Sequence, residues 1–151
     1  MKRTIKVLLV LFVAIIVTGC GESKKEAINP NKFITIADNY SYTVKEATSN
    51  YDYANSAYYY TSDFTNIFFI EGKESATINT LYMDEVTNYA NEAGTEAKTT
   101  TKKGDNYSIF MAANKDYFFF VGRVGKTIIK AKTRIDNKNK MVKFLTEIGY
   151  Y

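Results

Sequence analysis

The chain of 151 residues contains no histidine, no tryptophan and a single cysteine. The absence of histidine excludes Ser-His and Cys-His catalysis and metal sites that use histidine. One cysteine cannot build a disulfide framework or a cysteine-based zinc site. The single proline and eight glycines exclude collagen-like and linker-like chains. We therefore expect no catalytic residues, no metal site and no cofactor.

A strong charge of one sign is also absent beyond the first residues. Three of the 20 basic residues lie within the first six positions, and the others nearly balance the 16 acidic residues. The overall charge of +4 therefore gives no reason to expect a nucleic-acid partner. With 46% apolar and 24% charged residues, the chain is typical of one folded domain and not of a disordered protein.

The first 19 residues are predicted to be a signal peptide. Lys2, Arg3 and Lys6 form a positive start, and eleven consecutive apolar residues follow from Val7 to Val17. This run fits the apolar region of a signal peptide, and it is shorter than the roughly 20 residues that span a bilayer. The alternative is a simple signal peptide or a short membrane helix beside a chance cysteine.

The signal region ends in Val17-Thr18-Gly19-Cys20. This run resembles the lipobox of bacterial lipoproteins, in which an aliphatic residue and small residues lead to a cysteine. The resemblance implies that Cys20 carries lipid, with acyl chains such as palmitate, and begins a mature chain anchored to the extracytoplasmic face of the cell membrane. Two acyl chains give stable anchoring, whereas one is marginal. Residues 20–29 are predicted to be the lipidated cysteine and a polar, flexible tether.

The remaining residues, 30–151, are predicted to form a single α+β domain. Helical spacing of apolar residues indicates helices at about 30–40, 75–93 and 137–150, and short links favour an antiparallel sheet between them. We expect five or six strands packed against two or three helices in the order α-β-β-α-β-β-β-β-α. Helices on one face would make two layers. Apolar and aromatic runs predict the strands at 53–61, 65–71, 96–103, 107–113, 117–121 and 127–132.

This element order, a tyrosine-rich hairpin, a Gly-Asp-Asn turn at 104–106 and an Ile-Gly-Tyr ending at 148–150 are present together in the chain. The combination resembles small lipoproteins that are common in Firmicutes. The resemblance covers most of residues 30–150 and implies an extracytoplasmic domain tethered to the membrane. It transfers no catalytic residues, because that group has no assigned activity.

Charge is distributed unevenly along the mature chain. Residues 21–93 hold five lysines and eleven acidic residues, whereas residues 94–151 hold twelve basic and five acidic residues. We expect the two halves to attract each other, with most charges on ordinary solvated faces. The alternative is a basic face toward anionic wall polymers or lipid headgroups.

Aromatic residues are abundant, with 13 tyrosines and ten phenylalanines. Side chains alternate between the faces of a strand, which places Tyr58 and Tyr60 on one face and Tyr59 on the other. One face belongs to the core, and the other is a candidate ridge for stacking on sugars or docking a protein. We take Tyr51, Tyr53, Tyr58 and Tyr60 as the candidate binding surface. The alternative is that tyrosine serves only as a strand-forming residue at a half-buried surface.

We expect a membrane-anchored lipoprotein whose domain binds or shields an envelope polymer or protein without catalysing a reaction. A purely protective surface role fits the same sequence. The alternative is a carboxylate-dependent envelope hydrolase, or an inhibitor of one, because two acids suffice for glycoside hydrolysis. The candidate acids are Asp63, Glu71, Asp84 and Glu85, and the last two are adjacent on a helix and point in different directions. A hydrolase requires two facing carboxylates in a cleft, whereas a binding module requires a concave or aromatic patch.

Overall fold

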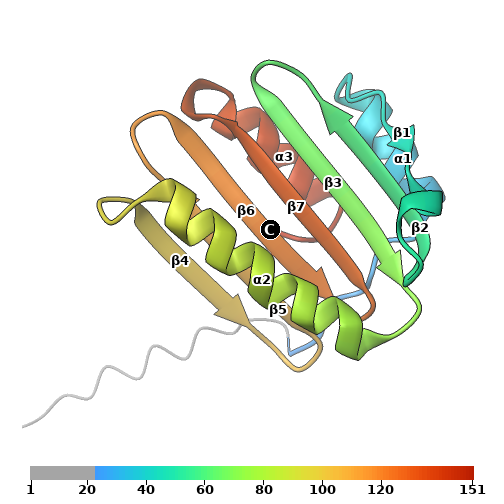
Figure 1. Ribbon diagram of the computed structural model, residues 1–151. Helices are drawn as coiled ribbons and strands as arrows, with labels where there is room; N and C mark the ends of the chain where they lie inside the picture. Colours follow the sequence, from blue (N-terminus) through green and yellow to red (C-terminus); the bar gives the residue numbers. More distant parts are fainter. Residues whose placement is uncertain (1–22) are drawn as a thin grey trace, which may run out of the picture.

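The computed structural model describes residues 23–151, in which three helices pack on one sheet (Figure 1). The predicted signal peptide and Cys20 lie outside the described residues. The predicted α+β class is confirmed. The elements are α1 (Pro30–Asn39), β1 (Lys45–Glu46), the 3-10 turn η1 (Thr48–Asn50), β2 (Ala54–Thr61), β3 (Thr65–Gly72), α2 (Ser75–Ala93), β4 (Lys98–Lys103), β5 (Tyr107–Ala113), β6 (Tyr117–Val124), β7 (Thr127–Arg134), the 3-10 turn η2 (Ile135–Asn137) and α3 (Lys138–Glu147).

All the strands of residues 23–151 belong to one seven-stranded antiparallel sheet with the order β1-β2-β3-β7-β6-β5-β4. Two sets of consecutive strands, β1–β3 and β4–β7, meet where β3 pairs with β7. There the hydroxyl groups of Thr65 and Thr133 lie 2.7 Å apart and form a buried hydrogen bond. The sheet exceeds the predicted five or six strands because β1 has only two residues, too few to show an alternating pattern.

Strand β6 is longer than the sequence predicts. It continues to Val124 instead of ending at residue 121, so Gly122 lies within the strand. A Cβ atom at Gly122 would lie 2.7 Å from the ring of Phe120 and 3.1 Å from the ring of Tyr150, and glycine therefore permits this close packing. The tight turn to β7 is formed by residues 125–126, where Gly125 has a φ of 57°.

Helices cover both faces of the sheet, so the predicted arrangement with helices on one face is wrong. Helix α2 lies on one face, and α1 and α3 lie on the other (Figure 1). Strand β6 shows the reason. Phe118 and Phe120 pack on the α1–α3 side, whereas Phe119 and Val121 pack on the α2 side. All four are at most 2% exposed, and a strand that is apolar on both faces requires a cover on each.

The core on the α1–α3 side is largely aromatic. Phe33 of α1 stacks on Phe69 of β3 with ring centroids 4.5 Å apart, and Phe144 of α3 meets Phe33 edge-on at 6.1 Å. Helix α1 starts as predicted, because the Asn29 side chain accepts a hydrogen bond from the Lys32 N–H at 2.9 Å. Ile28 is buried in the same core, so the folded domain begins before residue 30.

Helix α3 ends at Glu147, earlier than the predicted residue 150. Gly149, with a φ of 84°, reverses the chain, and the Tyr150 N–H donates to the Leu145 carbonyl at 2.8 Å. This turn carries the Tyr150 side chain into the core, where it has no exposure and its hydroxyl hydrogen-bonds to Thr127. Across residues 23–151, no helix has both the length and the apolar character needed to cross a bilayer.

Candidate functional site

The face of the sheet that carries α2 is only partly covered. Helix α2 packs mainly on β6, also on β5 and β7, and less on β3 (Figure 1). On the same face, Ala57 of β2 and Ile70 of β3 are buried, whereas Tyr59 and Phe68 are only half-buried. A groove of about 370 Å³ lies there. We call it the α2–β3 groove; its lining residues are Tyr59, Tyr60, Thr61, Asn66, Ile67, Phe68, Tyr89, Glu92, Lys130 and Lys132.

Strand register sets the floor of the α2–β3 groove. Tyr59 of β2 is paired with Phe68 of β3, which is in turn paired with Lys130 of β7. Side chains at paired positions of neighbouring strands stand side by side on one face. Tyr59 and Phe68 are each half-buried, so their rings form an aromatic floor that is open to solvent.

A partly buried ion pair joins this floor to the helix. The Lys130 Nζ lies 2.5 Å from the Glu85 Oε2, and the two side chains are 29% and 18% exposed. The same ammonium group lies 4.9 Å from the ring centre of Tyr89, a cation–π distance. Glu85 belongs to the acidic half of the chain and Lys130 to the basic half, so the predicted attraction between the halves is confirmed here.

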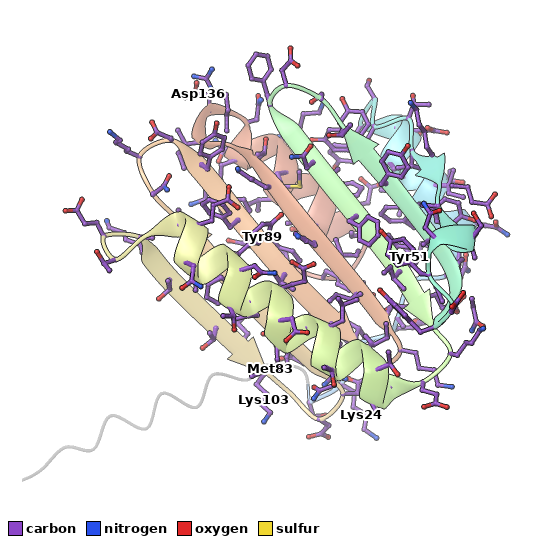
Figure 2. All side chains as sticks on the ribbon, in the orientation of Figure 1. Lys24, Tyr51, Met83, Tyr89, Lys103 and Asp136 are labelled. Atoms are coloured by element: carbon purple, nitrogen blue, oxygen red, sulfur yellow. The ribbon has the colours of Figure 1, made fainter. Side chains whose placement is uncertain are left out.

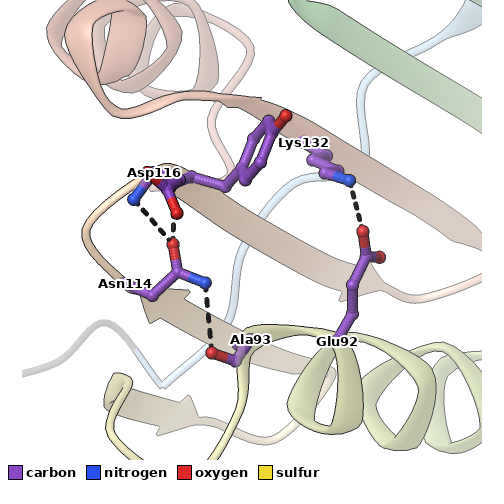
Figure 3. Close-up of polar contacts among 6 residues, drawn as sticks. Glu92, Ala93, Asn114, Asp116 and Lys132 are labelled. Atoms are coloured by element: carbon purple, nitrogen blue, oxygen red, sulfur yellow. Dashed lines mark hydrogen bonds and ion pairs between the residues drawn. The ribbon is translucent and has the colours of Figure 1, made fainter.

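A second ion pair, between Lys132 and Glu92, lies about two helical turns further along α2 (Figure 3). The Lys132 ammonium group also lies 4.4 Å from the ring centre of Tyr117. The end of α2 beside Glu92 is fixed by Asn114, whose side-chain amide donates to the Ala93 carbonyl at 3.1 Å (Figure 3). These contacts hold the charged wall of the groove against the sheet.

Tyr51 and Tyr53, two of the four predicted binding residues, flank the aromatic floor. The ring of Tyr51 meets Phe68 edge-on at 5.3 Å and Tyr53 at 5.7 Å. Burial raises the pKa of Tyr53, and the neighbouring Tyr51 and Glu85 raise it further. Burial, followed by Glu85 and Glu92, also raises the pKa of Tyr89. Both phenols are protonated at neutral pH, as an ordinary tyrosine is, and can donate hydrogen bonds.

The other two predicted residues lie on the opposite face of the sheet. Tyr58 packs near Phe69, with ring centroids 6.4 Å apart, and Tyr60 packs on Tyr42 at 5.1 Å. Both belong to the edge of the α1–α3 core. The structure therefore brings Tyr51 and Tyr53 together and separates them from the rings of Tyr58 and Tyr60. Tyr60 also borders the α2–β3 groove, although its ring packs on the other face.

The four candidate acids lie at separate places. Asp63 is in the β2–β3 turn, and Glu71 is near the other end of β3, where it accepts a hydrogen bond from Ser56 at 3.4 Å. Glu85 pairs with Lys130, and Asp84 borders a different hollow, beside Tyr53. Within the part of the chain that the structure describes, no three acidic or cysteine side chains gather to hold a metal ion.

Sequence reasoning missed the residues at the centre of the groove: Tyr59, Phe68, Tyr89, Lys130 and Lys132. One signal was available, because side chains alternate along β3 and place Phe68 on the face opposite to its buried neighbours, residues 67 and 69. The position of α2 over β5–β7, which leaves Phe68 open, depends on pairing between distant strands and has no local signal.

Comparisons with known proteins assign no family. No protein-family model matches the chain, and no curated protein matches it. Among solved structures, the chain is similar to the crystal structure of a GTP binding regulator from Thermotoga maritima, with a TM-score of 0.46 and 12% identity. The alignment covers 84% of this chain and 90% of that one. A likeness at this level carries no argument about function.

Proposed function

We propose that this chain is a lipoprotein, anchored through Cys20 to the extracytoplasmic face of the membrane, whose domain binds an envelope glycan without catalysing a reaction. The observation that carries the binding role is the α2–β3 groove, an aromatic floor left partly exposed beside helix α2. The anchor rests on the sequence from Lys2 to Cys20.

The chemistry of the groove suits a sugar polymer. Sugar rings present apolar C–H faces, which stack on aromatic rings such as those of Tyr59 and Phe68. Their hydroxyl groups need donors and acceptors, which Thr61, Asn66 and the charged wall provide along the same groove. A volume of about 370 Å³ is within the range of small-molecule sites, and it fits one or two sugar units of a longer chain.

The separate positions of Asp63, Glu71, Asp84 and Glu85 favour binding over hydrolysis. Glycoside hydrolysis requires two carboxyl groups about 5–10 Å apart on either side of the scissile bond. Among these four acids, Glu85 contacts a residue of the groove, since it is paired with Lys130.

The anchor is tested by growing cells with a fatty-acid probe. The wild-type chain should be labelled and recovered with the membrane fraction, and Cys20→Ser should be unlabelled. A wild-type chain that is unlabelled and found in the cytosol would contradict the proposal.

The groove is tested by titrating the full chain, extracted from membranes in detergent, with soluble fragments of cell-wall glycan. Tyr59→Ala should weaken binding by about three- to ten-fold, the value of one aromatic stack. Tyr58→Ala is the matched control, because the two residues are adjacent, both half-buried and on opposite faces. Equal effects of the two substitutions would show that the groove is not the binding site.

A further inference from the structure

The start of the described chain is fixed to the turn between β4 and β5. The Lys25 N–H donates to the Asn106 Oδ1 at 2.9 Å, and the Asn106 Nδ2 donates to the Lys25 carbonyl at 2.8 Å. The Asp105 N–H donates to the Ser23 carbonyl at 2.7 Å. One side-chain amide thus satisfies both backbone groups of Lys25, in the manner of a neighbouring strand.

Further contacts make this segment part of the fold. The Lys25 Nζ donates to the Gly149 carbonyl at 3.3 Å and lies 5.4 Å from the ring centre of Tyr107. Ile28, three residues later, is only 6% exposed. Gly104 leaves room for the segment, since a Cβ atom there would lie 2.8 Å from the Ser23 carbonyl oxygen. From Ser23 onward the chain is therefore attached to the body and does not act as a free tether.

This attachment limits how far the domain can stand from a lipid at Cys20. Only residues 21 and 22 separate Cys20 from Ser23, and an extended chain advances by about 3.3–3.6 Å per residue. Ser23, which is hydrogen-bonded to the β4–β5 turn, is then held within about 11 Å of the anchored cysteine. This step rests on the proposed lipid anchor.

The same end of the molecule carries exposed lysines. Lys24 and Lys103 both lie at the end where the described chain begins, whereas Asp136 lies at the opposite end (Figure 2). Lys24, Lys102 and Lys103 are exposed. Lys102 lies 4.9 Å from the ring centre of Tyr151, and the ion pairs found within residues 23–151 are all elsewhere.

Three acidic groups of the described chain lie beside Lys24, Lys25, Lys102 and Lys103. Asp105 lies in the turn itself, Glu26 lies one residue after Lys25, and Glu147 borders the same hollow as Lys25 and Glu26. Anionic lipid headgroups attract lysines that come within roughly 8 Å, the screening length at physiological salt. A turn that is hydrogen-bonded to a residue within about 11 Å of the anchor brings long lysine side chains toward the headgroups.

We propose that the β4–β5 end of the sheet, with Lys24, Lys102 and Lys103, is a membrane-facing surface that binds anionic lipid headgroups. The docked segment Ser23–Ile28 sets this orientation. The α2–β3 groove, which includes Thr61 and Asn66 beside the β2–β3 turn, lies toward the other end of the strands and is directed away from the bilayer.

The test uses the full lipidated chain in vesicles of phosphatidylcholine with 30% phosphatidylglycerol, and in vesicles of phosphatidylcholine alone. Because Cys20 is the only natural cysteine, a single added cysteine carries a fluorophore, at Thr101→Cys near the β4–β5 turn or at Asp63→Cys in the β2–β3 turn. A headgroup-linked quencher should quench the label at position 101 at least three-fold more than the label at 63. The difference should grow with phosphatidylglycerol.

Charge is tested in the same vesicles. Phosphatidylglycerol should shift the equilibrium toward the orientation in which the β4–β5 turn contacts the headgroups. Lys102→Gln with Lys103→Gln should weaken this shift in the equilibrium constant about 25-fold, at about five-fold per lysine. Lys115→Gln with Arg134→Gln, at the Asp136 end, is the matched control and should have little effect. Equal quenching at 101 and 63, or equal effects of the two double variants, overturns the inference.

Fatty-acid labelling of Cys20 is measured on the same preparation. A labelled chain without preferential quenching at position 101 overturns this inference and leaves the lipid anchor intact. An unlabelled chain overturns both the anchor and the orientation that depends on it.

Discussion

The Lys130 ammonium group links the sheet to helix α2 through Glu85, with 2.5 Å between Nζ and Oε2. This contact fixes the helix at the edge of the aromatic floor, and the groove depends on that position. Because both side chains are less than a third exposed, the pair is better shielded from water than a surface ion pair.

We expect a double-mutant cycle with Glu85→Gln and Lys130→Gln to give a coupling energy of about 1 kcal/mol in urea unfolding. The exposed pair Arg134–Asp136, with 3.6 Å between Nη2 and Oδ2, is the comparison and should give a coupling close to zero. Equal couplings would show that the Lys130–Glu85 contact does not hold the helix in place.

Stability should fall at alkaline pH because of a buried tyrosine. Burial, followed by Tyr60 and Tyr40, raises the pKa of Tyr42 to about 12. The unfolded chain loses this proton near pH 10, while the folded chain keeps it, so unfolding becomes more favourable between pH 10 and 12. Tyr42→Phe should reduce the loss of unfolding free energy across that window. Tyr151→Phe, at the exposed C-terminal residue, should not; an unchanged pH profile for Tyr42→Phe would contradict the assignment.

Asn106→Ala should release the docked segment without unfolding the sheet. It removes two hydrogen bonds to Lys25, at a cost of about 1 kcal/mol each. Amide hydrogen exchange at Lys25 and Asp105 should become faster, while exchange in β6 should change little. Asn106→Asp retains the acceptor and should give an intermediate result. Unchanged exchange at Lys25 would contradict the docking.

The two glycines of β6 and its turn should respond differently. Gly122→Ala places a Cβ atom 2.7 Å from the Phe120 ring and should lower the unfolding free energy by about 1–3 kcal/mol. At Gly125 nothing lies within 4 Å of the added atom, and only its φ of 57° is restrictive. Gly125→Asn should cost less than about 1 kcal/mol, because asparagine tolerates this conformation. Urea unfolding of both variants measures these changes. A larger loss of unfolding free energy in Gly125→Asn than in Gly122→Ala would contradict the prediction.

The local sequence pattern predicted most helices and strands, but it did not predict which face of the sheet each helix covers. The run 117–121 is apolar at every position, which predicts a strand that is buried on both faces or covered by a helix, and the structure buries it on both faces. The same fact requires covers on two sides, but which helix covers which face depends on the β3–β7 pairing between residues that are distant in sequence. Tyr51 and Tyr53 precede β2, where strand alternation does not apply. A register shift between Ala54 and Ser56 lies between these residues and Tyr58, so counting alternate positions from Tyr58 does not predict their face.

The central claim is that the α2–β3 groove binds a glycan, and the 13 tyrosines offer a direct measurement. Fluorotyrosine can replace tyrosine throughout the chain, and the fluorine spectrum can be followed as soluble cell-wall glycan is added. The resonances of Tyr51, Tyr53, Tyr59 and Tyr89 should shift together with one affinity, while those of Tyr42 and Tyr150 on the opposite face should not. Shifts confined to the opposite face, or none at all, would contradict the account.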